Sequence, residues 1–294
     1  MLPLKDENPT RRKPFVTVVL IGVCLWLFFA WQPIGGGSGV DVQTPEGTLR
    51  FADESLPFTL QYAAIPCEIT RGRPLTVAEL EATFGGPVPQ AEACGVGQGA
   101  SPPVFPQKSV WLALLTSMFL HGGLAHLGGN LLFLWIFGNN IEDHLGHVRY
   151  LVFYLIGGVV ASAAHIGLNL DSTIPVVGAS GAIAAVMGAY LVWFPDAPVR
   201  TVVFFFFITL VDIRARWLLL FWFASQFFTA PSSGVAWAAH VGGFVFGVVV
   251  GLAIKANSSF RRMAWTRDYR TVRGWDRTGG IGYGPYQQRR FRGR

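Results

Sequence analysis

Long apolar blocks separated by polar stretches dominate this chain of 294 residues, and the blocks lack the 3.6-residue stripe of an amphipathic helix. A helix needs about 20 mostly apolar residues to cross the hydrocarbon layer of a bilayer. The pattern therefore predicts an all-α membrane protein with six transmembrane helices. The predicted spans are residues 15–31, 109–137, 150–166, 180–194, 215–230 and 235–254.

The apolar run 202–211 is left out of this count, because ten residues are too few to cross a bilayer as a helix. Asp212 and Arg214 separate this run from the next predicted span. We expect it to be a segment that lies at the membrane interface.

The first block, 15–31, follows a polar segment, 1–14, that contains four basic residues. A cleaved signal peptide has the same order of basic and apolar regions. No Ala-x-Ala-like cleavage site follows, however, and the block ends in bulky residues that include Trp26 and Trp31. We therefore predict that it is a retained first transmembrane helix.

Residues 32–107 form a long polar insertion rich in glycine and proline, and most of its charged residues are acidic. Because basic residues are concentrated in cytoplasmic loops, this insertion is predicted to face outward. Cys67 and Cys94 would then lie in an oxidising compartment, and we hypothesise that they form a disulfide.

Composition and charge agree with a membrane protein. The chain is 51% hydrophobic and only 14% charged, with a mean hydropathy of +0.42, whereas soluble domains are about 25% charged. The net charge of +6 comes from the two ends. Six spans would put both ends on the same side of the cell membrane, and we predict that this side is the cytoplasm. The arginines at 200, 214 and 216 are predicted to lie on the same side.

The basic segment 256–294 has no apolar period and is predicted to be a disordered cytoplasmic tail. An RNA-binding role would also account for its arginines. Attraction to the anionic inner leaflet explains the same charge more simply, and we expect no nucleic-acid partner.

Ser180 opens an apolar run and is flanked by Gly178 and Gly181. The first N–H groups of a helix are unpaired, and they lie at the positive end of the helix dipole. Serine often serves only as an N-cap at such a position. The flanking glycines allow close approach of another backbone or a substrate, so a nucleophile is the alternative interpretation.

Three further polar side chains lie inside predicted spans, where such groups are costly and often mark function. His126 and Asn130 are four residues apart and share one helix face, whereas His121 is separated from them by a predicted loop at Gly122 and Gly123. His240 opens the last span.

Small residues predict that the helices after Ser180 and His240 pack together. Gly243, Gly247 and Gly251 recur every four residues in the last span, and Gly181 and Gly188 lie on a small face of the other helix. This packing would place the imidazole of His240 beside the Ser180 hydroxyl and make a competent nucleophile. His126, Asn130 and the Ser180 N–H could stabilise an oxyanion.

Other interpretations of these polar groups remain open. They could be hydrogen bonds that join helices in a bundle. Ligation of a metal or haem by His121, His126 and His240 is disfavoured, because the helical His-Glu-x-x-His motif is absent. A soluble α/β-hydrolase elbow needs Gly two residues after the serine, and Ala182 stands there. We expect no metal and no cofactor.

In this order, the motifs resemble those of the rhomboid family of intramembrane serine proteases. The resemblance covers residues 109–256 and the first span. It rests on His121-x4-His126-x3-Asn130, Glu142-Asp143 with Gly146, Gly178-Ala179-Ser180-Gly181, Ala239-His240-x2-Gly243 and the six-span layout.

The resemblance implies a six-helix, rhomboid-like core over 108–255. It implies that Ser180 is the nucleophile and His240 the base of a dyad, and that His126 and Asn130, with the Ser180 amide, form the oxyanion hole. His121, Gly178 and Gly181 would line the site. The implied substrates are single-span membrane proteins, cut in or near their transmembrane segments.

Two positions depart from the family pattern. Some members carry a Tyr one turn after the serine that stacks on the catalytic histidine, and here Ala184 stands there. The Trp-Arg pair usual in the first outer loop is also absent. His240 must therefore be held in another way, and the docking of the loop on the bilayer is not predicted.

A protease has two alternatives here, a protein that only binds transmembrane helices and a transporter. A catalytically silent relative could use the same fold to bind transmembrane helices of client proteins, although such relatives usually lack the serine or the histidine. A transporter would show paired halves with broken spans, and the sequence contains no internal repeat.

Overall fold

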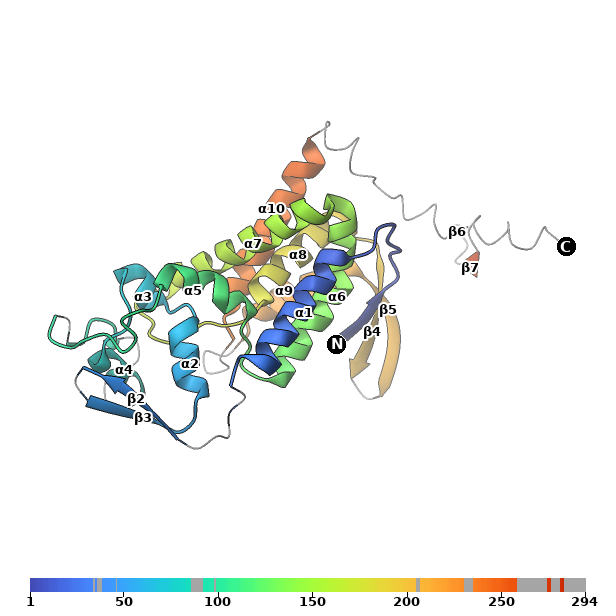
Figure 1. Ribbon diagram of the computed structural model, residues 1–294. Helices are drawn as coiled ribbons and strands as arrows, with labels where there is room; N and C mark the ends of the chain where they lie inside the picture. Colours follow the sequence, from blue (N-terminus) through green and yellow to red (C-terminus); the bar gives the residue numbers. More distant parts are fainter. Residues whose placement is uncertain are drawn as a thin grey trace.

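A helical bundle forms the middle of the molecule in the computed structural model (Figure 1). The structure describes residues 1–294 except 34, 36–38, 46, 86–91, 98, 205–206, 230–234, 258–273, 276–280 and 283–294. The predicted tail, 256–294, thus lies almost wholly outside the described residues. The bundle helices are α1 (Phe15–Ala30), α5 (Val110–Thr116), α6 (Leu124–Leu145), α7 (His147–Leu168), α8 (Ser180–Trp193), α9 (Ala215–Gln226) and α10 (Trp237–Ala256).

The helix lengths support some of the six predicted transmembrane helices. Among the described residues, α7 and α10 are long and apolar enough to cross a membrane. A third span results if α5, with the 3-10 turn η2 (Ser117–Phe119), is joined to α6 across a bend of 79°. That bend contains the loop expected at Gly122 and Gly123. The helices α1 and α8 are apolar but shorter, and α9 has 12 residues.

Glycines bring α8 and α10 into backbone contact, as the small-residue pattern predicts. A Cβ atom added at Gly243 would overlap the carbonyl oxygen of Gly181, and one at Gly247 would overlap that of Ala185. A Cβ at Gly188 would overlap the carbonyl of Phe244. Because α8 is surrounded in this way, nearly all of its side chains are buried.

Two carboxylates at the end of α6 hold the start of α1. The buried Glu142 accepts hydrogen bonds from the N–H groups of Val16 and Thr17, both at 2.8 Å. Asp143 accepts from the N–H groups of Arg11 and Arg12. Glu142 thus satisfies two N–H groups that the start of α1 leaves unpaired, at the positive end of the helix dipole, and Asp143 holds the segment just before the helix.

The apolar run 202–211, for which a place at the membrane interface stays a prediction, contributes to strands, so the chain is mostly but not purely helical. This run lies in a hairpin of β4 (Pro198–Phe204) and β5 (Ile208–Arg214), and β4 also pairs antiparallel with β1 (Leu2–Asp6). The run is rich in β-branched and aromatic residues, which favour strands. Pairing with the N-terminal segment supplies the hydrogen bonds that a lone segment would lack.

The insertion 32–107 contains a folded part, which we call the first-loop domain (residues 40–107). It consists of the paired strands β2 (Val40–Thr44) and β3 (Gly47–Phe51) and the helices α2 (Ser55–Tyr62), α3 (Pro66–Arg71) and α4 (Val77–Phe84). Leu60, Ile65 and Leu80 belong to a separate apolar core. The domain therefore buries side chains of its own.

A disulfide between Cys67 and Cys94, the pair named as a candidate, crosslinks this domain. Beside it, Glu79 forms an ion pair with Arg73 over 2.7 Å. Burial alone would raise the pKa of Glu79, but hydrogen bonds from Arg73 and from backbone N–H groups lower it below its usual range. Glu79 is therefore a charged partner of Arg73 and not a spare acid.

A buried ion pair ties the first-loop domain to the beginning of α5. Lys108 pairs with Glu68, and its ammonium also donates to the carbonyl oxygens of Leu60 and Ala63. Burial raises the pKa of Glu68 and lowers the pKa of Lys108, and the pairing opposes both shifts. These contacts tie the domain to the segment that leads into α5.

The first-loop domain and the β1-β4-β5 sheet lie at opposite ends of the bundle (Figure 1). The start of α1 meets the end of α6, where His144 stacks on Trp193 at the end of α8, with ring centroids 4.2 Å apart. Lys255, at the end of α10, donates to the carbonyl of Val192. The N-terminal segment and the end of α10 therefore lie at the same end as the sheet.

Candidate active site

Ser180 and His240 are hydrogen-bonded although 60 residues separate them in the sequence. The Ser180 Oγ lies 2.7 Å from the His240 Nε2. Ser180 is the first residue of α8 and His240 lies in the first turn of α10. The glycine contacts between these two helices bring their first turns together, so the pairing follows from the packing.

Gly178 keeps a space open beside this pair. Its φ of +127° belongs to the region that favours glycine, and its N–H donates to the carbonyl of Ser117. A Cβ atom at Gly178 would lie 2.8 Å from the His126 Nε2 and 3.5 Å from the Ser180 Oγ. The missing side chain therefore leaves room between the serine hydroxyl and the imidazole of His126.

The hydrogen bonds of His126 determine which of its nitrogens carries a proton. The N–H of Gly122 donates to the His126 Nδ1 over 3.3 Å. In the neutral ring, an Nδ1 that accepts a hydrogen bond leaves the proton on Nε2. His126 thus presents an N–H donor to the space that Gly178 keeps open.

Asn130 lies one turn after His126 on the same helix, as expected, and makes a hydrogen bond within that helix. Its amide nitrogen donates to the carbonyl oxygen of His126 over 2.9 Å, and the residue is 6% exposed. An amide nitrogen has two N–H groups, and this bond uses one of them.

His121 packs against His126, and it is not among the described residues that line the cavity beside Ser180. The two rings pack edge to face with centroids 5.3 Å apart, and the His121 Nδ1 lies 3.2 Å from the carbonyl of Phe119. Gln32, which follows α1, donates to the His121 carbonyl and accepts from its N–H. His121 therefore supports the ring of His126 and holds the bend before α6.

Sequence reasoning missed the residue on the other side of His240. The Gln226 Oε1 lies 2.7 Å from the His240 Nδ1, and Trp222 from the same helix lies beside the imidazole with ring centroids 5.7 Å apart. A polar Gln inside the apolar run of α9 was the signal that could have identified it, because polar groups within spans often mark function.

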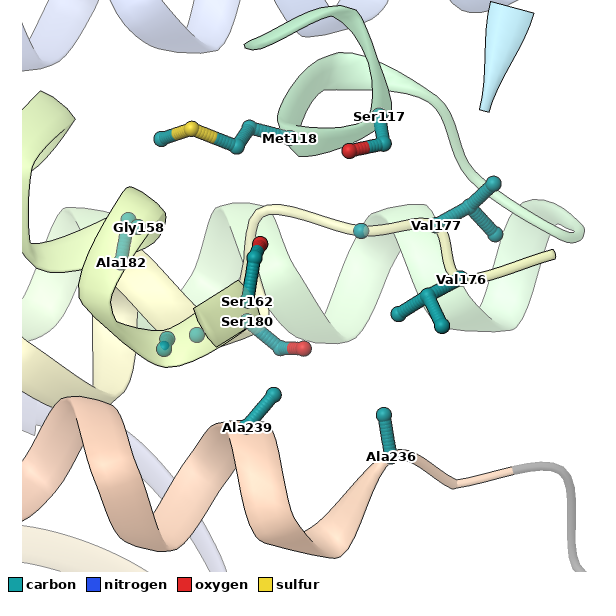
Figure 2. A pocket seen from close by; sticks show the side chains of 13 residues that line it. Ser117, Met118, Gly158, Ser162, Val176, Val177, Ser180, Ala182, Ala236 and Ala239 are labelled. Atoms are coloured by element: carbon teal, nitrogen blue, oxygen red, sulfur yellow. The ribbon is translucent and has the colours of Figure 1, made fainter. Parts of the chain in front are cut away.

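A small cavity of about 20 Å³ adjoins the Ser180 hydroxyl, with room for about one water molecule. Figure 2 shows it between the turn at Ser117 and Met118 and the start of α10, where Ala239 points toward Ser180. Gly178 and Gly181 also line it. Several of the lining residues are glycine or alanine, which leaves space beside the Ser180 side chain.

One group of potential metal ligands, Cys67, Glu79 and Cys94, occurs among the described residues. Both sulfur atoms are in the disulfide, and Glu79 is paired with Arg73. A metal site needs free thiolates or a free carboxylate, so these residues do not fit a metal ion.

Comparison with protein families matches residues 108–257, half of the chain, to the Rhomboid domain. The chain is 43% identical over 81 residues to Rhomboid protease GluP of Bacillus subtilis, which covers 28% of this chain and 15% of that protein. It is 29% identical over 149 residues to the mitochondrial Rhomboid protein 1 of Saccharomyces cerevisiae (48% and 41%). It is 31% identical over 160 residues to human Rhomboid-related protein 3 (51% and 38%). The chain thus spans less than half the length of each of these relatives.

Proposed function

This chain belongs to the rhomboid family, and from that premise we propose that it is an intramembrane serine endopeptidase. The observation that carries the proposal is the hydrogen bond between the Ser180 Oγ and the His240 Nε2, beside a space that a glycine keeps open. A serine is a weak nucleophile unless an adjacent base takes its proton. This pair provides that base.

In the proposed reaction, His240 Nε2 takes the hydroxyl proton while the Ser180 Oγ attacks the carbonyl carbon of the scissile peptide. The His126 Nε2–H, Asn130 and the Ser180 N–H stabilise the negative charge that forms on the carbonyl oxygen. His240 then gives its proton to the leaving amine as the C–N bond breaks. Water, activated by the same imidazole, hydrolyses the acyl-enzyme and regenerates Ser180.

The proposed topology has six transmembrane helices over 15–31 and 108–255, with both termini in the cytoplasm of a cell and the first-loop domain outside. Two observations support it. The N-terminal segment and the end of α10 lie at one end of the bundle. The arginines of that end, Arg200 and Arg214 in the sheet and Arg216 at the start of α9, satisfy the positive-inside rule if it is cytoplasmic.

Single-span membrane proteins are the proposed substrates. The Ser180–His240 pair lies at the ends of α8 and α10 nearest the first-loop domain, since Val176 forms a bridge with Ala64 of that domain. A peptide bond near the outer end of a substrate helix would reach this depth. The alternative is a catalytically silent protein that binds client helices, and the intact hydrogen-bonded pair argues against it.

The experiment that tests the proposal is labelling of the membrane-embedded protein with a fluorophosphonate probe, together with cleavage of a model single-span substrate. We expect wild type to be labelled and to cleave, and Ser180→Ala and His240→Ala to do neither. His144→Phe, at the opposite end of the bundle, is the matched histidine control and is expected to keep both activities. Labelling or cleavage that persists in Ser180→Ala would reject the proposal.

A further inference from the structure

We propose that Gln226 is the positioning residue that fixes the orientation and the tautomer of His240. The inference rests on the proposed function, and it concerns the side of the imidazole that faces away from Ser180. Gln226 is the last residue of α9 and is 7% exposed. Its side chain therefore acts on the ring from a buried place.

The other hydrogen bonds of Gln226 determine which end of its amide faces the imidazole. The Gln226 Nε2 donates to the carbonyl oxygen of Trp222 over 2.9 Å and to the Ser225 Oγ over 3.3 Å. A carbonyl oxygen can only accept, so the nitrogen end must face Trp222. The oxygen end, Oε1, then faces the His240 Nδ1 at 2.7 Å.

The direction of this bond sets the proton positions along the hydrogen bonds that connect Gln226, His240 and Ser180. Because the Gln226 Oε1 can only accept, the His240 Nδ1 must carry a proton. In the neutral imidazole Nε2 is then unprotonated, and it is the atom that lies 2.7 Å from the Ser180 Oγ. The ring is thus held in the one tautomer that can accept the serine proton.

The neighbouring side chains explain why a residue of α9 positions His240. Ala184, one turn after the serine, is fully buried and offers no ring to stack on His240. Trp222 lies beside the imidazole on one face, tilted by 38° to its plane. Together, Trp222 limits the tilt of the ring and Gln226 limits its rotation about the Cβ–Cγ bond.

The chemical role resembles that of the carboxylate in a serine triad, which orients the imidazole and stabilises it when it becomes charged. A neutral amide orients the ring equally well but gives less stabilisation to the imidazolium. Loss of Gln226 should therefore lower kcat by less than the roughly 10⁴-fold decrease that follows when an anionic partner is changed.

The test compares Gln226→Leu, which has no acceptor, with Gln226→Glu. A protonated glutamic acid is isosteric with the amide: its hydroxyl can donate to the Trp222 carbonyl while its C=O accepts from His240. We expect Gln226→Leu to lower kcat and the rate of fluorophosphonate labelling about 10²-fold with KM nearly unchanged. Gln226→Glu should restore both to within about threefold of wild type.

Ser225→Ala is the matched control, because Ser225 does not touch His240 in any described contact and the shorter bond to the Trp222 carbonyl still fixes the Gln226 amide without it. It should keep kcat within about threefold of wild type. Unchanged kcat in Gln226→Leu would overturn the inference. So would loss of activity in both the Leu and the Glu variants with a lowered denaturation temperature, which would assign Gln226 a structural role. Ser180→Ala, measured in parallel, distinguishes these results from failure of the proposed function.

Discussion

The hydroxyl of Tyr190 donates a hydrogen bond of 2.8 Å to the carboxylate of Asp6, and it thereby joins the helix that begins at Ser180 to the first strand of the chain. Asn140 of α6 donates to the same oxygen. Asp6 is 6% exposed. Burial raises the pKa of Asp6 from its usual 3.8 to about 7, although the bond from Tyr190 opposes the shift.

The stability of the protein should depend on pH through Asp6. Because its pKa is higher in the folded than in the unfolded state, the folded state binds the proton more tightly between pH 4 and 7. Stability is then highest below pH 4 and falls, by up to about 4 kcal/mol, as pH rises to 7. Thermal denaturation in detergent should show this fall for wild type and not for Asp6→Asn. Parallel curves for the two proteins would show that another group titrates.

Replacement of Gly247 by alanine should unfold the bundle or lower its denaturation temperature sharply. The added Cβ would overlap the carbonyl oxygen of Ala185, so α8 and α10 would have to separate. Overpacking of this kind costs about 1–3 kcal/mol or more. Gly167→Ala, where no atom lies within 4 Å of the added Cβ, is the control and should be neutral. Equal denaturation temperatures for the two variants would contradict the packing argument.

Gly178→Ala should abolish labelling of Ser180 while the protein stays folded. The new methyl group would lie 2.8 Å from the His126 Nε2 and fill the space in which the oxyanion is proposed to form. Gly47→Ala separates this effect from backbone strain, since Gly47 has a similar φ, +142°, but has no atom within 4 Å of an added Cβ. Activity in Gly178→Ala equal to that of Gly47→Ala would remove the role given to this space.

Asn130→Ala should slow turnover of a model substrate by about 10²-fold or less, because other oxyanion donors remain. Asn169→Ala is a close control. Its amide makes the same bond, over 2.8 Å, to a carbonyl four residues earlier, that of His165. A kcat loss shared by both variants would point to helix stability, and an unchanged kcat in Asn130→Ala would exclude the assigned role.

Loss of the Cys67–Cys94 disulfide should loosen the first-loop domain. The two cysteines are 27 residues apart, and closing a loop of that size contributes about 3–4 kcal/mol in the chain-entropy model. Reductant should accelerate proteolysis of this domain in wild type. It should have no further effect on the variant with Cys67→Ser and Cys94→Ser. Equal digestion of wild type with and without reductant would show that the apolar core suffices.

The features that the amino-acid sequence predicted correctly are properties of short segments of the chain. The apolar block after Ser180 begins as a helix at that residue, and the four-residue spacing of His126 and Asn130 places both on one face of α6. Glycines four residues apart in α10 indicated close contact with another helix, and that helix is α8. Each of these follows from helical period and side-chain size, which depend only on neighbours in the chain.

The partners of these groups were decided by the tertiary structure. The described residues of the apolar run 202–211 belong to β4 and β5, and β1, from the other end of the chain, pairs with β4. Glu142 accepts from the N–H of Val16, 126 residues earlier, at the start of α1, and Gln226 reaches His240 from a different helix. Hydropathy and spacing cannot specify such pairs, because they depend on which helices pack together and at what angle. That arrangement exists only once backbone contacts such as that of Gly247 with Ala185 have formed.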